Sequence, residues 1–204
     1  MSDCCNSGCS ATADALKHKQ RGVLITVLLI NAIMFVVVVV AAQIAGSSAM
    51  FADSLDFLGD ALTYGLSLLV VAGSVQAKAK VAIFKGTLIG LAALAVVAQV
   101  IYKLFYPSVP VFGLMGVFAV VSLAANSVCL YLLTAHKTDD VNMSSVWECS
   151  RNDILTNLSV LATAILVWLT QSGWPDVIVA ALLSILLLRS SIRVLRSGFA
   201  ELKA

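Results

Sequence analysis

Charged side chains are scarce in this sequence: Asp, Glu, Lys and Arg make up 12% of its 204 residues, whereas apolar residues make up 60%. Soluble domains carry about 25% charged residues, so this composition excludes an ordinary soluble fold. The mean hydropathy of +1.00 agrees with that exclusion. The chain is therefore predicted to lie in a lipid bilayer.

Histidine and proline are also rare, with two histidines and three prolines in the whole sequence. His18 and His136 both fall outside the long apolar segments, and no nucleophile is found paired with a base, so we do not expect an enzyme. The sequence has no phosphate-binding loop, and neither ATP nor an organic cofactor is expected. The net charge of +2 gives no argument for nucleic acid as a partner. The prolines fall within 106–110 and 170–176, which are predicted to break helices.

Long apolar segments fill most of the chain. A helix needs about 20 apolar residues to cross the roughly 30 Å hydrocarbon core of a bilayer. Continuous apolar runs, rather than ten-residue alternations, favour helices over barrel strands. Six segments satisfy the length requirement: 22–45, 48–74, 81–105, 112–135, 145–170 and 175–192. We expect an all-α membrane protein, a six-helix transmembrane domain over 22–192 flanked by a tail at 1–21 and a short tail at 193–204.

Lysine and arginine indicate the orientation of this bundle. Positive charge in short loops stays on the cytoplasmic side. Nearly all of it lies before the first segment, around the even-numbered connections or after the last segment, at Lys17, Lys19, Arg21, Lys78, Lys80, Lys85, Lys137, Arg189, Arg193, Arg196 and Lys203. Both termini are therefore expected to be cytoplasmic.

Three aspartates lie within the second apolar segment, in the stretch DSLDFLGD. Their spacing of three and four residues puts Asp53, Asp56 and Asp60 on one helix face. Asp56 and Asp60 are expected about 14 to 20 Å below the membrane surface. Acids at such depth indicate a functional site. Asp53 lies nearer the helix end, where a solvated or capping role is an open alternative.

A second pair of candidate ligands lies in the fifth segment. Cys149 and Asp153 are four residues apart and share a helix face. The second and fifth helices enter from opposite surfaces, so both pairs should reach the same midplane layer. Four ligands from two helices suit a tetrahedral zinc ion, and the sulfur extends tolerance to softer ions such as cadmium. Cys129 has no acid four residues on and is interpreted as a packing residue.

A faint internal repeat relates the two halves of the chain. Asn31 precedes Asp60 at nearly the distance that separates Asn126 from Asp153, and DALTYGLS echoes DILTNLS. Each half then holds three spans and runs in the opposite direction to the other. Inverted halves that meet at a midplane site are typical of transporters.

The pattern Asp-x-x-Asp-x-x-x-Asp in the second of six spans, with Cys-x-x-x-Asp in the fifth, resembles the cation diffusion facilitator family of zinc and divalent-metal/proton antiporters. The resemblance extends over the whole bundle. It implies that Asp56, Asp60, Cys149 and Asp153 hold the transported metal. It also implies a multi-pass protein of the cell (inner) membrane that acts as a homodimer, with Asn126 and Asn157 at positions where the family often carries asparagine. Those asparagines and Asp53 are candidates for an ion or proton path.

The chain departs from the family pattern in two places. Family members usually carry histidine where this chain has Cys149, which leaves the choice among zinc, cadmium and cobalt open. The sequence ends at Ala204, so the usual cytoplasmic domain after the sixth helix is expected to be lacking, as in a short branch of the family.

Three cysteines lie close together near the N-terminus. Cys4, Cys5 and Cys9 are expected in the reducing cytoplasm, where disulfides are rare and thiolates are available for accessory metal capture. A flexible tail without a fixed role is the alternative interpretation.

These patterns predict metal efflux by proton antiport, with alternating access to one site. Ligands must shed protons before they bind a metal, so protons that compete for the same groups would release it. Two other functions stay open on the sequence alone. One is a membrane protein that binds or senses a metal without transporting it, and the other is a proton-coupled exporter of small organic cations.

Overall fold

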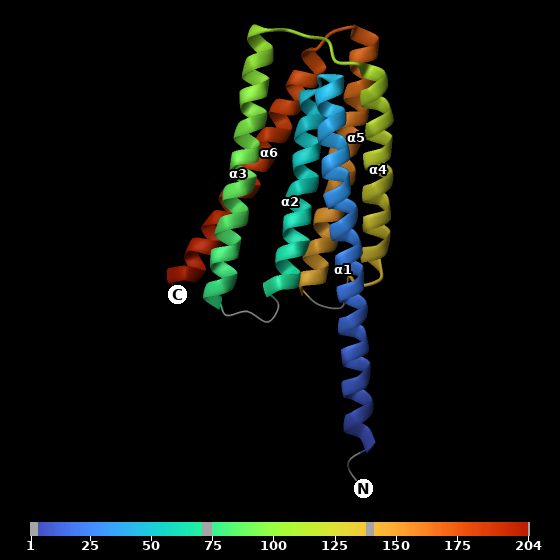
Figure 1. Ribbon diagram of the computed structural model, residues 1–204, viewed down its shortest axis with the longest axis vertical. Coiled ribbons are helices and arrows are strands. Elements are labelled where there is room, and N and C mark those ends of the chain that lie inside the picture. Colours follow the sequence, from blue (N-terminus) through green and yellow to red (C-terminus); the bar gives the residue numbers. More distant parts are fainter. Residues whose placement is uncertain (1–3, 71–74, 138–140, 204) are drawn as a thin grey trace.

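The computed structural model describes residues 4–70, 75–137 and 141–203; the side chains of 4–20, 66, 67, 69, 70, 75–79, 81, 141–146, 149, 201 and 203 fall outside that description. The described residues form helices and no strands. The helices are α1 (Cys4–Ala45), α2 (Ser48–Val70), α3 (Val75–Phe105), α4 (Phe112–Thr134), α5 (Val141–Thr170) and α6 (Trp174–Lys203), shown in Figure 1. Their order agrees with the six predicted segments, although α1 and α3 begin earlier than predicted and α6 ends later.

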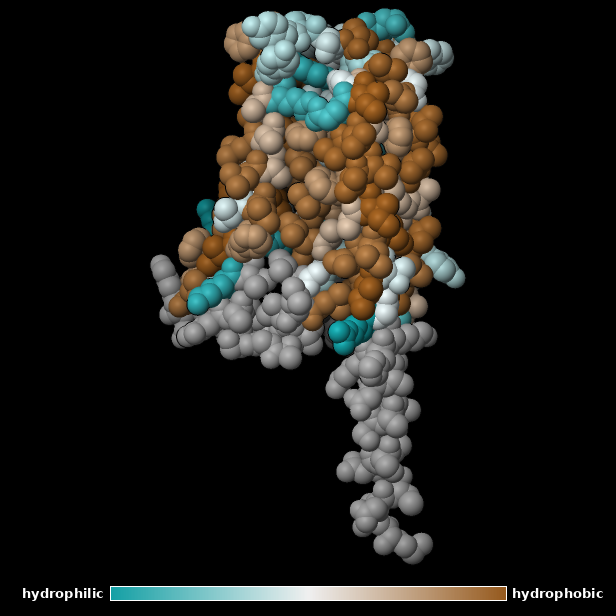
Figure 2. Space-filling view, in the orientation of Figure 1, coloured by the Kyte–Doolittle hydropathy of each residue, from teal (hydrophilic) through white to brown (hydrophobic). Residues whose placement is uncertain are grey.

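Five of these helices are long and apolar enough to cross a membrane, over Arg21–Ala45, Ala82–Phe105, Phe112–Thr134, Ser150–Thr170 and Trp174–Ala200 within the described chain. The remaining helix, α2, carries the three aspartates. Figure 2 shows the apolar surface that covers the helical body. On α1 this surface includes Leu29, Ile33, Val36 and Val40, which recur every three or four residues along one exposed face. The prediction of an all-α, multi-pass membrane protein is therefore confirmed.

Both termini lie at the same end of the molecule, and the connections α1–α2, α3–α4 and α5–α6 lie at the other (Figure 1). We call these the terminal end and the opposite end. Helix α1 extends past the bundle at the terminal end, because it begins at Cys4 rather than at the predicted start of the span. The assignment of the terminal end to the cytoplasm stays a prediction.

The helices form two groups. In the first, α1 contacts α2 and α4, and α5 contacts the same two helices, so the four make a ring with α2 and α4 at opposite corners. In the second, α3 and α6 pack on each other, and both contact α2. Glycines permit this close pairing: a Cβ on Gly86 would meet Leu195 Cγ at 2.8 Å, and one on Gly90 would meet Ser191 Oγ at 2.8 Å. Their spacing is that of the GxxxG motif of packed membrane helices.

The turn between α1 and α2 fixes where the aspartate-bearing helix begins. Gly46 has a positive φ of 63°, and Ser47 N donates to Ala42 O at 3.0 Å, which together make a Schellman end for α1. Ser47 Oγ then accepts a hydrogen bond from Met50 N at 3.1 Å and caps the N-terminus of α2. This cap sets the depth of the three aspartates below the opposite end.

Candidate functional site

Two buried apolar clusters lie in the helical body, and the larger one extends from the four-helix ring to α3 and α6. The large cluster includes Val38, Met50, Phe57, Met115 and Val160. The small cluster, nearer the terminal end, consists of Leu24, Val27, Tyr64, Cys129 and Leu133. Along α1, α2 and α4, the chain passes from one cluster to the other through a polar residue: Asn31, Asp60 and Asn126 respectively.

Helix α5 adds Asp153 and Asn157 to the same depth, beside Val160 of the large cluster. We call Asn31, Asp60, Asn126, Asp153 and Asn157 the polar layer. Polar groups buried between apolar clusters of a membrane bundle are costly and indicate a functional site. Asn31 is 0% exposed, Asn157 1% and Asp153 7%, so lipid does not solvate them.

The central contact of the polar layer joins two acids from different helices. Asp60 on α2 has a side-chain hydrogen-bond contact with Asp153 on α5. Two bare carboxylates repel, so a proton or a cation has to lie between them. The sequence predicted that α2 and α5 bring one acid each to a common depth, and the structure places these two acids together.

The other two predicted ligands flank this contact. Asp56 lies one turn from Asp60 on α2, half-buried and within electrostatic range of both Asp60 and Asp53. Cys149 lies one turn from Asp153 on α5, and its side chain falls outside the described residues. Among the side chains that are described, no group of three or more His, Cys, Asp or Glu is arranged to hold a metal. The four-ligand set therefore stays a prediction, of which the Asp60–Asp153 contact is the described part.

Two further residues act on Asp60. Tyr64, one turn along α2, and Lys85 of α3 both lie within electrostatic range of the Asp60 carboxylate. Neither residue was predicted, because Tyr64 looks like an ordinary apolar position and Lys85 was counted only as a loop charge.

Asp53 has a different environment from the other two aspartates of α2. Its side chain is 2% exposed, and its Oδ2 accepts a hydrogen bond of 3.0 Å from Ser122 Oγ of α4, the helix at the opposite corner of the ring. The alternative of a solvated surface residue is therefore wrong. Its predicted place on an ion or proton path stays a prediction.

The two predicted asparagines both face the interior. Asn126 is 4% exposed and Asn157 is 1% exposed. Neither the amide nitrogen nor the amide oxygen of Asn157 has a hydrogen-bond partner among the described residues. An orphaned buried amide one turn from Asp153 is suited to a cation or its water, because a buried polar group without a partner costs about 1 to 3 kcal/mol.

Sequence reasoning predicted Asn126 of α4 but missed the contacts of Cys129 on the same helix. Cys129, interpreted as a packing residue, accepts a hydrogen bond from Asn31 Nδ2 at 3.7 Å and lies within electrostatic range of Asp60. The spacing becomes informative only when the packing is known: Ser122 and Cys129 are seven residues apart, as are Asp53 and Asp60. Because α2 and α4 run in the same direction, the equal step of seven residues puts Ser122 at the depth of Asp53 and Cys129 at the depth of Asp60.

The N-terminal cysteines lie on the part of α1 that extends beyond the ring (Figure 1). The side chains of Cys4, Cys5 and Cys9 fall outside the described residues, so accessory metal capture stays a prediction.

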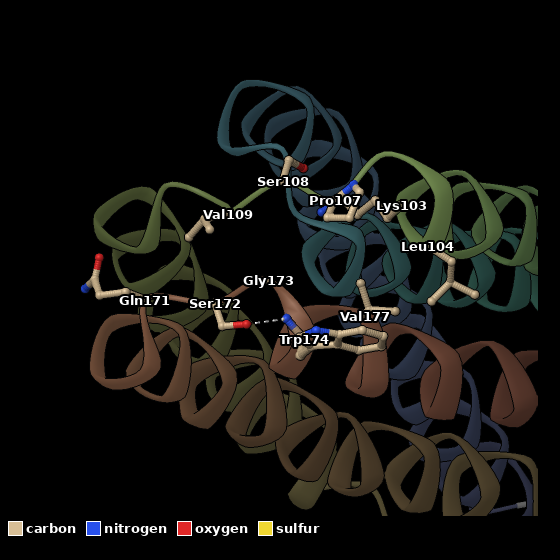
Figure 3. Close-up of a pocket in the computed structure, with 10 residues that line it drawn as sticks. All are labelled: Lys103, Leu104, Pro107, Ser108, Val109, Gln171, Ser172, Gly173, Trp174 and Val177. Carbon is tan, nitrogen blue, oxygen red and sulfur yellow. Dashed lines mark hydrogen bonds between the residues drawn. The ribbon is translucent and has the colours of Figure 1, made fainter.

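A cavity of about 220 Å³ lies at the opposite end, between the α3–α4 and α5–α6 connections (Figure 3). Its lining includes Lys103, Pro107, Ser108, Ser172 and Trp174 but no acid. A lining without carboxylate or thiol does not suit a divalent metal, and this cavity is separate from the polar layer.

The comparisons with known proteins agree with this geometry. The model of the cation efflux transmembrane domain matches residues 24–203. The zinc transporter ZitB of Yersinia pestis is 25% identical over 190 residues, which cover 85% of this chain and 60% of that protein. The ZitB of Yersinia pseudotuberculosis serotype I (strain IP32953) is 24% identical over the same shares of both chains. The chain thus spans about 60% of the length of the curated relatives it matches.

The matched domain runs from the first buried residues of the ring to the end of α6, and so takes in α2 and α5 with Asp60 and Asp153. Its members are transporters rather than enzymes, in agreement with the expectation from the sequence. The chain belongs to the cation efflux family, the cation diffusion facilitators that its aspartate pattern predicted.

Proposed function

We propose that this chain exports a divalent metal cation, zinc or a thiophilic relative such as cadmium or cobalt, in exchange for protons. The observation that carries the proposal is the Asp60–Asp153 contact between α2 and α5, inside a polar layer with apolar clusters on both sides. Asp56, Asp60, Cys149 and Asp153 are the metal ligands. The chain's similarity to two zinc transporters supports zinc as the first ion to test.

The two clusters have the positions of gates in an alternating-access cycle. The large cluster separates the polar layer from the opposite end, and the small cluster separates it from the terminal end. Metal from the cytoplasm reaches the layer when the small cluster opens at the terminal end. It leaves when the large cluster parts, which exposes the same ligands to the other side.

Proton exchange follows from the chemistry of the ligands. Carboxyl and thiol groups bind a metal only after they lose their protons. When the metal leaves, the buried groups have to take up protons again, because unpaired charges are costly inside the membrane. One ligand set thus serves both ions in turn, which is the requirement for antiport. Asp53, Asn126 and Asn157 line the path between the ligands and the surfaces.

The contact pattern also supports inverted halves. Helix α1 packs on α2 as α4 packs on α5, and α2 and α5 meet each other at the acids. The halves α1–α3 and α4–α6 then run in opposite directions through a multi-pass protein of the cell (inner) membrane, with both termini cytoplasmic. The homodimer implied by the family is part of the proposal.

A flux assay tests the proposal. Purified chain in proteoliposomes with an imposed pH gradient should take up zinc or cadmium and move protons the opposite way. Asp60→Asn and Asp153→Asn should abolish uptake, whereas the exposed acid Glu148→Gln, on the same helix as Asp153, should leave it unchanged. Metal binding without flux would instead support a sensor, and flux of an organic cation that survives loss of metal binding would support the third alternative.

A further inference from the structure

Cys129 and Asn31 face each other across the contact between α4 and α1. Asn31 Nδ2 donates to Cys129 Sγ at 3.7 Å, with Cys129 1% and Asn31 0% exposed. A buried cysteine alone is ordinarily a small packing residue. This one is within electrostatic range of Asp60, an acid of the proposed metal site.

The amide of Asn31 supplies a second, independent observation. Its Nδ2 also donates to Val27 O at 2.8 Å, and because a backbone carbonyl only accepts, this contact identifies the amide nitrogen. Both hydrogens of Nδ2 are then used, one by Val27 O and one by Cys129 Sγ. The amide oxygen, Oδ1, is buried and has no partner among the described residues. It is an acceptor in need of a donor or a cation.

Three helices therefore contribute to the surroundings of this thiol: Asn31 of α1 contacts Cys129 of α4, and the carboxylate of Asp60 on α2 is within electrostatic range of the sulfur. Cys129 is itself a member of the small apolar cluster, which the metal has to pass on its way from the terminal end. Sulfur and oxygen donors together suit zinc and, more strongly, cadmium.

We propose that Cys129, Asn31 and Asp60 form a second cation position, a relay for thiophilic divalent metals between the small cluster and the ligands on α2 and α5. This inference rests on the proposed function of metal transport, and it adds α1 and α4 to the helices that hold the cargo. The relay shares Asp60 with the transport site, so an ion passes from one position to the other without leaving that carboxylate.

The test uses cadmium alone as the probe and the full chain in lipid nanodiscs. Serine at Cys4, Cys5, Cys9 and Cys149 leaves Cys129 as the sole thiol of five. Cadmium should then produce a saturable ultraviolet sulfur-to-metal charge-transfer band at one ion per chain. Asn31→Leu should weaken this binding about tenfold or more, as loss of a ligand or of its supporting hydrogen bond does.

A matched control moves the thiol to the neighbouring residue. Val128 is 50% exposed on the outer side of α4, so Val128→Cys combined with Cys129→Ser keeps one thiol on the same helix but aims it at lipid. That variant should give no saturable band. An equal band from the control, or no band from Cys129, would overturn the relay.

If the variant with four serines does not fold, single variants of the native chain decide. Cys129→Ser should lower the band amplitude per bound cadmium, and an unchanged amplitude would sink the proposal. The band reports binding and not flux. If Cys129 binds no cadmium but zinc flux is intact, the relay is wrong and the proposed function stands. If Cys129 binds cadmium but zinc flux is absent, the proposed function is wrong and the second cation position stands.

Discussion

Lys103 Nζ of α3 lies 2.8 Å from Asp176 Oδ2 of α6, and the two side chains are 6% and 0% exposed. The same carboxylate accepts hydrogen bonds from Ser47 Oγ at 2.6 Å, Ser48 N at 2.8 Å and Ala49 N at 3.0 Å. Lys103 also donates to the carbonyl of Gly46. One ion pair thus ties α3 and α6 to the N-terminus of α2, at the opposite end from the chain termini.

Loss of one partner of this pair should destabilise the protein. Lys103→Met leaves Asp176 as a buried charge without its counter-ion, which costs about 3 to 5 kcal/mol. Asp176→Ala should cost at least as much, because it also removes the acceptor for two N–H groups of α2. Thermal unfolding in detergent measures both effects. Equal melting temperatures for Lys103→Met and the native chain would show that the pair contributes nothing.

Bound metal should stabilise the chain through the polar layer. A ligand that binds only the folded state at a hundred times its dissociation constant contributes about 2.7 kcal/mol. Zinc should therefore raise the melting temperature of the native chain, and a chelator should reverse the rise. Asp60→Asn removes the carboxylate that meets Asp153, so it should abolish the shift. Glu148→Gln, which removes an exposed acid, is the control and should keep the zinc-induced rise in melting temperature. If the rise survives Asp60→Asn, the metal binds elsewhere.

Asp53 should matter more to transport than to metal affinity. Ser122→Ala removes the hydrogen bond to this buried carboxylate, at a cost of about 1.5 to 3 kcal/mol if the group is charged. Asp53→Asn keeps the shape and removes the exchangeable proton. Zinc affinity by calorimetry should change little in Asp53→Asn, whereas proton-coupled flux should fall. A parallel loss of affinity would make Asp53 a ligand instead.

The helix order and the aspartate-bearing face of α2 could be read from the sequence, because both depend on local rules. Apolar length identifies spans, and spacing of three and four residues identifies a face. The same rules put Asp60 and Asp153 at a common depth, and the structure joins them.

The contacts of α4 and the end of α3 could not be predicted in this way. That Ser122 reaches Asp53 depends on α2 and α4 lying at opposite corners of a ring, which is a property of packing. Asp176 falls in the stretch 170–176 that was predicted to break helices, and no role was predicted for Lys103. Their pairing joins residues far apart in the sequence, and no local pattern marks it.

The thiol of Cys149 should set the metal preference. Sulfur favours cadmium over harder ions, whereas imidazole favours zinc without the same preference for soft metals. Cys149→His should therefore lower cadmium affinity relative to zinc in competition binding, with zinc flux retained. The thiol of Cys129 is unchanged in this variant, so a change in metal preference comes from position 149. If Cys149→His leaves the cadmium-to-zinc ratio unchanged, the side chain of Cys149 does not reach the metal.

Substitution of glycine by alanine should have opposite effects on stability at two positions: Gly86, where α3 packs closely on α6, and Gly116 on α4, where the added atom meets nothing. A Cβ at Gly86 would lie 2.8 Å from Leu195 Cγ and 3.2 Å from Leu195 N, so Gly86→Ala has to push backbone apart. Overpacking of this kind costs about 1 to 3 kcal/mol. At Gly116 in α4 nothing lies within 4 Å of the new atom, and alanine should stabilise the helix by about 0.5 to 1 kcal/mol. Melting temperatures that move down for Gly86→Ala and up for Gly116→Ala would confirm that α3 and α6 touch through this glycine face. A fall in both would mean that helix propensity and packing are not separable here, and a rise in both would contradict the contact.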